Sequence, residues 1–189
     1  METEKCRAQA IVREDYRTLV HADAEIEIPS GMEKVTAFYR SVVRAAVRWA
    51  EEAEGKRARE AYAAINDIWE KSRFVPAVMR LRGTCHLIDE VHFAVVCEAV
   101  LTRGSERETR CAAQVWNRVE ETLLPMREIL RRWLGQTRQP KLGYHADGCY
   151  PINGEVVFFR NPRGTDPFQS TRGRFEKKSR KGGKSGKNT

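Results

Sequence analysis

Polar and apolar residues alternate with a period of two near the start of the chain. Over residues 12–28 this is clearest where Ala24, Ile26 and Ile28 interleave with acidic residues. Alternation of this kind indicates a strand with one buried face, and here it predicts either one strand or two strands with an irregularity between them.

A long amphipathic helix is predicted over Gly31–Ser72. Ser30 and Glu33 have the spacing of a capping box, which indicates the helix start. Gly55 leaves open whether this is one helix or two joined near that residue. The first apolar residues recur at a spacing of three and four: Val35, Phe38, Tyr39, Val42, Val43, Ala46, Trp49, Ala50 and Ala53.

After the helix the pattern becomes typical of strands. Three segments rich in Val, Leu and Thr are separated by short turn signals: Phe74–Leu87, Val91–Arg103 and Glu106–Val119. Consecutive strands with short connections predict an antiparallel meander.

A short helix and a hairpin are predicted next. Pro125–Leu134 has an apolar face, a proline suited to the first turn and a glycine directly after the last residue. Tyr144–Tyr150 and Glu155–Arg160 flank Asn153 and Gly154, a pair that favours a tight hairpin turn.

This order of elements predicts an α+β fold: an antiparallel sheet of five or six strands, with one long helix and one short helix packed on one face. Near the C-terminus the composition shifts to Gly, Ser, Lys and Arg. We therefore expect residues 1–170 to form a single domain and residues 171–189 to form a disordered basic tail.

The net charge of +8 is concentrated in that tail. Residues 171–189 carry +7, which leaves +1 for residues 1–170. A tail of this charge is either a solubilising terminus or a polyanion-binding segment that neutralises phosphates. The residues that would bind a polyanion are Arg172, Arg174, Lys177, Lys178, Arg180, Lys181, Lys184 and Lys187.

The rest of the composition favours a cytosolic protein without a cofactor. We find no secretory signal and no apolar run of the roughly 18–20 residues that span a membrane. The five cysteines are widely spaced, which favours free thiols in a reducing compartment and gives no CxxC pair for a zinc site. No P-loop, GxGxxG or GxSxG motif is present.

One candidate catalytic group consists of His145, Asp147 and Cys149. They occupy alternate positions, so on a strand they would line one face of the sheet. Asp147 would then lie beside His145 on the sheet, and its carboxylate would not be in line with a ring nitrogen of the imidazole to orient it. This favours a solvated face over a catalytic site.

A second candidate pair is His86 and His92. A two-residue turn at Asp89 and Glu90 would place Leu87 opposite His92 and point the two imidazoles to opposite faces of the sheet. That arrangement cannot share a metal ion, so we expect structural or solvated roles for both histidines.

The order of elements resembles a bacterial domain of unknown function, found at the C-terminus of RsiV-like anti-sigma factors and in PdaC-type peptidoglycan deacetylases. In the anti-sigma factors such a domain binds a lysozyme outside the cell. The resemblance implies the fold and a general binding character, and it supplies no catalytic residue. It rests on Trp116 and Asn117, on Glu121–Leu130, and on Gly154–Pro162 with Asp166, Pro167 and Phe168.

Three functions are consistent with these patterns. The first is a non-enzymatic cytosolic binding or regulatory module that recognises a protein or peptide partner. The second is a small enzyme that uses His145, Asp147 and Cys149, or His86 and His92. The third is a nucleic-acid-associated protein, acting through the tail and requiring a basic face on the body, for which Arg40, Arg44 and Arg48 could line one helical stripe.

Overall fold

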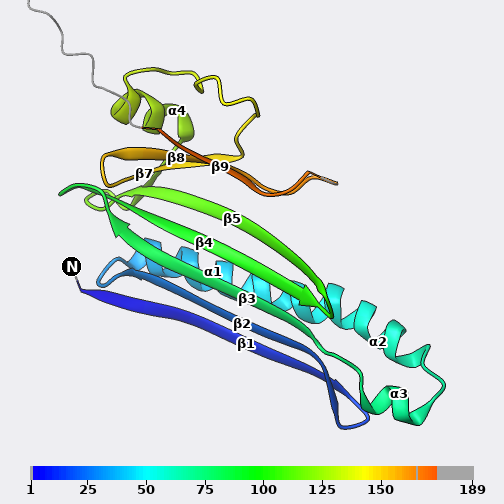
Figure 1. Cartoon of the computed structure of the whole chain (residues 1–189). Coiled ribbons are helices and arrows are strands. Elements are labelled where there is room, and N and C mark those ends of the chain that lie inside the picture. The colour runs from blue at the N-terminus through cyan, green and yellow to red at the C-terminus, as the bar shows by residue number, and fades with distance from the viewer. Residues whose placement is uncertain (1, 165, 174–189) are drawn as a thin grey trace, which may run out of the picture.

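A six-stranded mixed sheet forms the body of the molecule (Figure 1). The computed structural model describes residues 2–164 and 166–173. Neighbouring strands are antiparallel except β2 and β3, which are parallel because the long helix connects them. In order across the sheet the strands are β1 (Thr3–Glu14), β2 (Arg17–Pro29), β3 (Ala77–Leu87), β4 (His92–Arg103), β5 (Glu106–Asn117) and β6 (Thr122–Leu124).

The first strand pattern corresponds to two strands, as the second sequence alternative predicted. β1 and β2 form a long hairpin whose turn residues, Asp15 and Tyr16, have φ angles of 46° and 62°. Positive φ at both central residues is the geometry of a type I′ turn, which asparagine and glycine usually provide. β1 begins at Thr3, earlier than the sequence pattern predicted.

The long helix runs without a break from α1 (Glu33–Trp49) through a π-helical turn, η1 (Ala50–Glu54), into α2 (Gly55–Ala63). Gly55 does not interrupt it. A Cβ atom there would lie 3.3 Å from Cγ2 of Val12, so the glycine lets the helix approach β1 closely. The helix ends before the predicted Ser72, and a separate short helix, α3 (Ile68–Ser72), follows.

The predicted capping box is not formed at the helix start. Met32 is the N-cap residue, and its side chain makes no capping hydrogen bond. Instead, a carboxylate oxygen of Glu121, from the β5–β6 connection, accepts a hydrogen bond of 2.7 Å from the backbone N–H of Lys34. Glu121, which is 87 positions from Lys34 in the sequence, therefore provides the hydrogen-bond acceptor that was expected from Ser30.

The main core lies between α1 and one face of the sheet. Inward-facing residues of α1, including Tyr39 and Val43, pack on alternate residues of the strands, including Ile26 and Phe93. The indole N–H of Trp116 donates a hydrogen bond of 3.0 Å to the Tyr39 hydroxyl. This buried pair aligns the helix with β5.

A second, smaller sheet lies on the opposite side of β4 and β5 (Figure 1). Its strands are β7 (Gly148–Ile152), β8 (Glu155–Arg160) and β9 (Gln169–Gly173), and the first two are joined by the predicted turn, in which Asn153 and Gly154 have positive φ. The short helix, α4 (Met126–Ile129) with the π-helical turn η2 (Leu130–Leu134), packs here through Ile129 and Leu130.

The predicted α+β class, with one long and one short helix, is confirmed, and three details differ from the prediction. The predicted hairpin belongs to a separate three-stranded sheet instead of extending the main one. The sheet is mixed rather than wholly antiparallel. The short helix lies on the side of the sheet away from α1, because Ala94 and Val115 point away from the main core and pack with Ile129 and Leu130. No helix within the described residues is both long and apolar enough to cross a membrane.

Candidate functional site

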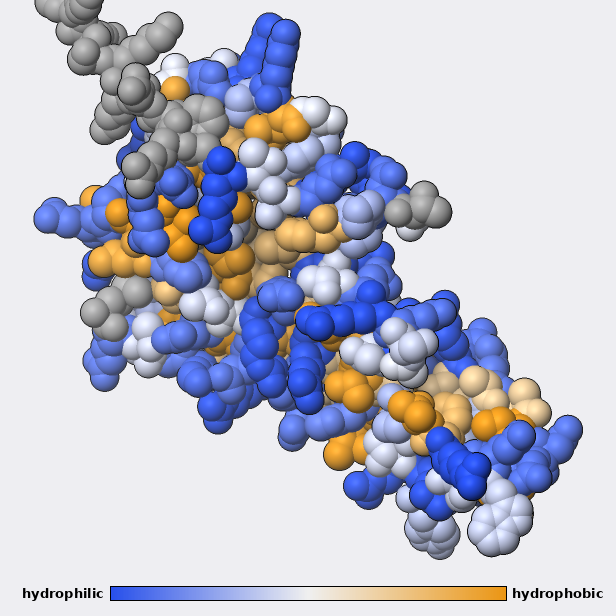
Figure 2. Space-filling view, viewed as in Figure 1, coloured by the Kyte–Doolittle hydropathy of each residue, from blue (hydrophilic) through white to orange (hydrophobic). Residues whose placement is uncertain are grey.

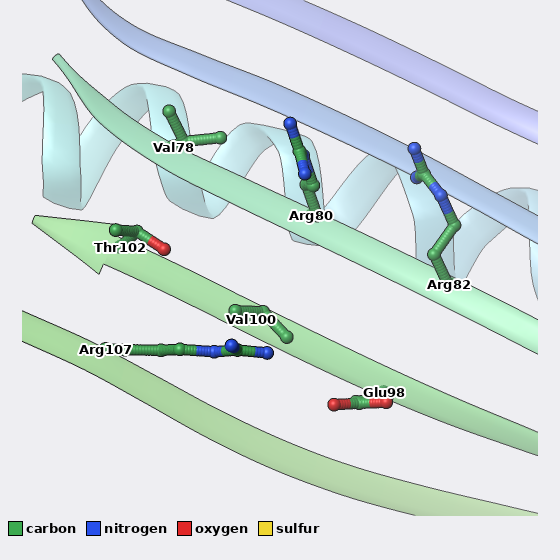
Figure 3. A pocket seen from close by; sticks show the side chains of 7 residues that line it. All are labelled: Val78, Arg80, Arg82, Glu98, Val100, Thr102 and Arg107. Atoms are coloured by element: carbon green, nitrogen blue, oxygen red, sulfur yellow. The ribbon is translucent and has the colours of Figure 1, made fainter.

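The face of the six-stranded sheet that is turned away from α1 carries a shallow groove of about 570 Å³. In Figure 3 the lining side chains stand on this face while α1 passes behind the strands. The groove is lined by Val78, Arg80 and Arg82 of β3, Glu98, Val100 and Thr102 of β4, and Arg107 of β5.

Strand register places a strip of small and apolar side chains between two arginines. Val100 on β4 is directly opposite Arg80 on β3. Thr102, two residues further along β4, is opposite Arg107 on β5. Figure 3 shows Arg107 reaching along the sheet towards Val100. The floor of the groove is therefore largely apolar, and a guanidinium lies on either side of it.

The two arginines beside the floor are unpaired within the described residues, whereas their neighbours are paired. Arg82 donates a hydrogen bond to the carboxylate of Asp23. Glu25 binds Lys5 and Arg7, each at 2.7 Å, and the hydrogen bond from Lys5 lowers the pKa of Glu25. These contacts occupy Asp23 and Glu25 on β2. Glu98 of β4 also lines the groove, opposite Arg82, and in the described part of the chain forms no ion pair with Arg80 or Arg107, so both guanidinium groups remain available to a ligand.

The surface around the groove combines both kinds of side chain. Figure 2, viewed on this side of the molecule, shows strongly hydrophilic side chains lying beside hydrophobic patches. A surface of this composition suits a partner that offers both charge and apolar contact.

Sequence analysis did not single out this groove. A local signal was present, because Arg80 and Arg82 alternate with buried Met79 and Leu81 along β3. Alternation shows that arginines share the solvent face of one strand, but it does not show which strand lies next to it. The contribution of Arg107 depends on the pairing of β4 with β5.

The structure separates the candidate residues His145, Asp147 and Cys149. Only Cys149 lies in a strand, and its thiol is buried in the second core, whereas His145 is exposed. Asp147 accepts a hydrogen bond from the backbone N–H of Asn161 and pairs with Arg163; these contacts lower its pKa. Burial raises the pKa of Cys149 to about 12, which disfavours a thiolate nucleophile at neutral pH.

The register assumed for His86 and His92 is wrong by one residue. His86 is opposite Ala94, and Leu87 is opposite Phe93, so the turn contains one more residue than predicted. Both imidazoles therefore lie on the same face of the sheet. Within the described residues, no group of three or more His, Cys, Asp or Glu side chains is arranged to hold a metal ion.

His92 has a specific structural environment. Its side chain is buried, Nδ1 lies 2.8 Å from Oδ1 of Asp89, and the ring packs edge-on against Trp133. Burial of Asp89 raises the pKa of its carboxyl, but hydrogen bonds from the backbone N–H groups of Val91 and His92 and from the His92 ring outweigh it, so the net pKa is lowered. The pair holds the β3–β4 turn in shape.

The predicted polyanion-binding residues lie mostly outside the described residues. Arg172 is the exception: it is exposed on β9 and pairs in register with Val157. β9 thus includes three residues, Thr171, Arg172 and Gly173, that the sequence analysis assigned to the tail.

Comparison with known proteins supports the fold. No family model and no curated protein matches the chain. A DUF3298 family protein from Pseudomonas aeruginosa has a similar structure, with a TM-score of 0.53 and 8% sequence identity over 89% of this chain and 88% of that chain. A DUF3298 family member from Bacteroides fragilis has a TM-score of 0.49, with 8% identity over 89% of this chain and 88% of its own.

DUF3298 is the domain found in RsiV and PdaC, so the resemblance drawn from the order of elements is confirmed at the level of fold. At 8% identity the likeness shows the fold alone.

Proposed function

We propose that this protein is a non-enzymatic binding module that recognises an acidic, extended segment of a protein or peptide partner in the sheet-face groove. The observation that carries the proposal is the position of Arg80 and Arg107, unpaired within the described residues, on either side of the floor at Val100 and Thr102. The resemblance to the domain of RsiV-like anti-sigma factors supports a binding role.

The chemistry of the groove suits carboxylates. A guanidinium presents its donors in a planar fork that matches a carboxylate, and such charge-assisted hydrogen bonds are stronger than neutral ones. The apolar floor at Val78 and Val100 can contact aliphatic side chains between the acidic residues of a partner. Because the groove is open to solvent, its charges contribute more to specificity and association rate than to affinity.

The test measures binding of a fluorescent acidic peptide to the full chain by anisotropy. The double variant Arg80→Gln/Arg107→Gln should bind about 3- to 30-fold more weakly, since two exposed ionic contacts are each worth up to about 1 kcal/mol. The control is Arg127→Gln/Arg138→Gln, which has the same change of charge at exposed positions outside the groove.

Two results contradict the proposal. One is equal weakening in the groove variant and the control, which would mean that only net charge matters. The other is unchanged affinity when the acidic residues of the peptide are replaced by their amides.

A further inference from the structure

After its first residue, Glu33, the solvent-facing side of α1 carries only positive charge. From Lys34 to Trp49 the helix contains four basic residues and no acidic residue. Three of them, Arg40, Arg44 and Arg48, recur every fourth residue and are exposed. They line a shallow surface groove of about 520 Å³ together with Ala37, Ser41 and Ala45. We call these three arginines the arginine row.

The arginine row forms no ion pair within the described residues. No salt bridge there involves Arg40, Arg44 or Arg48, although Arg7, Arg59, Arg82 and Arg103 on other elements each have an acidic partner. Like charges four residues apart on a helix cost about 0.2–0.5 kcal/mol per pair. Glu51 and Glu52 lie one helical turn after Arg48 and offset part of this repulsion, and an anionic ligand would relieve the remainder.

We propose that the arginine row binds the phosphate backbone of a nucleic-acid duplex. Successive arginines are about 6 Å apart along the axis, from four residues at about 1.5 Å each, so several phosphates can be contacted in a line. Their guanidinium groups bind phosphate oxygens bidentately. The small side chains of Ala37, Ser41 and Ala45 leave room for a backbone to approach the helix.

The same surface is less suited to other anionic partners. Protein interfaces depend on buried aromatic or large apolar anchors, and the residues that line this groove include none. Single-stranded nucleic acid is held by aromatic rings on which bases stack, and these are also missing from the lining residues. Phosphate contacts alone are sufficient for sequence-independent duplex binding.

The sequence favours the same partner independently, because residues 171–189 add a charge of +7. The arginine row lies on α1, on the other side of the sheet from the Arg80–Arg107 groove. The inference therefore does not depend on the proposed function, and each surface can be tested while the other is intact.

The test uses the full chain and a DNA duplex of about 20 base pairs, with affinity measured over a range of salt concentrations. The logarithm of affinity falls with the logarithm of salt by about 0.9 for each phosphate contact. The triple variant Arg40→Gln/Arg44→Gln/Arg48→Gln should therefore reduce the steepness of this dependence by about 2.7. The variant Arg40→Lys/Arg44→Lys/Arg48→Lys should retain most of the salt dependence of the wild type.

The control is Arg73→Gln/Arg127→Gln/Arg138→Gln, which removes three exposed charges outside the row and should leave the salt dependence near that of the wild type. Circular dichroism verifies that each variant is folded. The lysine variant keeps the three positive charges, so it shows whether a change in binding comes from loss of charge or from loss of the arginine side chains. An equal loss in the control and row variants overturns the inference. It is also overturned if poly-glutamate binds through the row and duplex DNA does not displace it, because the partner is then an acidic protein.

Discussion

Glu54 and Arg103 join the long helix to the sheet through two hydrogen bonds: the Glu54 carboxylate accepts from Nη2 and Nε of Arg103 at 2.6 and 2.7 Å. The Glu54 side chain is only 4% exposed. Glu54 lies at the end of the π-helical turn, on the same inward stripe as Ala50 and Ala58. A buried carboxylate on an otherwise apolar stripe depends on its partner to stay charged.

The first prediction concerns this pair. Arg103→Met should lower the free energy of unfolding by about 3–5 kcal/mol, because the buried Glu54 carboxylate loses both hydrogen bonds and keeps just the 3.9 Å contact with the exposed Arg57. The double variant Glu54→Leu/Arg103→Met should be much closer to the wild type. Urea unfolding measures both, with Arg110→Met as a control at an exposed arginine whose ion pair within the described residues is with Glu108. If the single and double variants are equally unstable, the buried charge is not the cause.

The second prediction is the pH dependence of the same pair. The hydrogen bond from Arg103 lowers the pKa of Glu54, against the opposing effect of burial. A carboxyl group whose pKa is lower in the folded protein stabilises the fold above its unfolded-state pKa of about 4.3. That contribution is lost as the pH falls through the folded-state pKa.

The wild type should therefore lose more stability between about pH 5 and pH 3 than the Glu54→Leu/Arg103→Met variant does. Asp89, Asp147 and Glu25 also have lowered pKa values and contribute in the same direction in both proteins. The difference between the two curves isolates Glu54. Parallel curves from pH 5 to pH 3 would contradict the assignment.

The third prediction concerns the parallel pair of strands. Gly83 of β3 is opposite Ile26 of β2, and a Cβ atom on residue 83 would lie 2.6 Å from Cγ2 of Ile26. Gly83→Ala should therefore destabilise the protein by about 1–3 kcal/mol. An Ile26→Ala background removes the contacts with Cγ1 and Cγ2 and leaves the one with Cβ at 3.0 Å, so the same change should cost clearly less there. Additive costs in a double-mutant cycle would show that the two residues are not in contact.

The fourth prediction concerns the thiols. Burial raises the pKa values of Cys85, Cys97 and Cys149 to about 12, and that of Cys111 to about 11. At pH 8 the native protein should react slowly with a chromogenic disulfide, while all five cysteines should react quickly in urea. Rapid native labelling of Cys149 would instead support the enzyme hypothesis built on His145, Asp147 and Cys149.

Local patterns in the sequence predicted most of the elements, because the interactions that form them are local. The meander strands and the short helix were placed within a few residues of their observed limits. The turn at Asn153 and Gly154 was predicted from the ease with which these residues take positive φ. The first part of β1, residues 3–11, was missed although Cys6, Ala8 and Ala10 alternate with polar residues, because small apolar side chains give a weak signal.

Errors arose where one extra residue, or a distant one, decided the geometry. A single additional residue in the β3–β4 turn brought His86 and His92 to the same face. Glu121 provides the hydrogen-bond acceptor at the start of α1 that Ser30 was expected to provide. Neither outcome can be derived from a window of neighbouring residues.

The sequence by itself determined the α+β class, the amphipathic helix with its row of arginines, and the concentration of charge in the last residues, because periodicity and composition act along the chain. Only the tertiary structure decided that Arg80 and Arg107 lie on either side of one floor, that Glu54 meets Arg103, and that Cys149 is buried away from His145. The physical reason is that strand register and the packing of the two sheets are set by contacts between distant segments, which depend on the whole core.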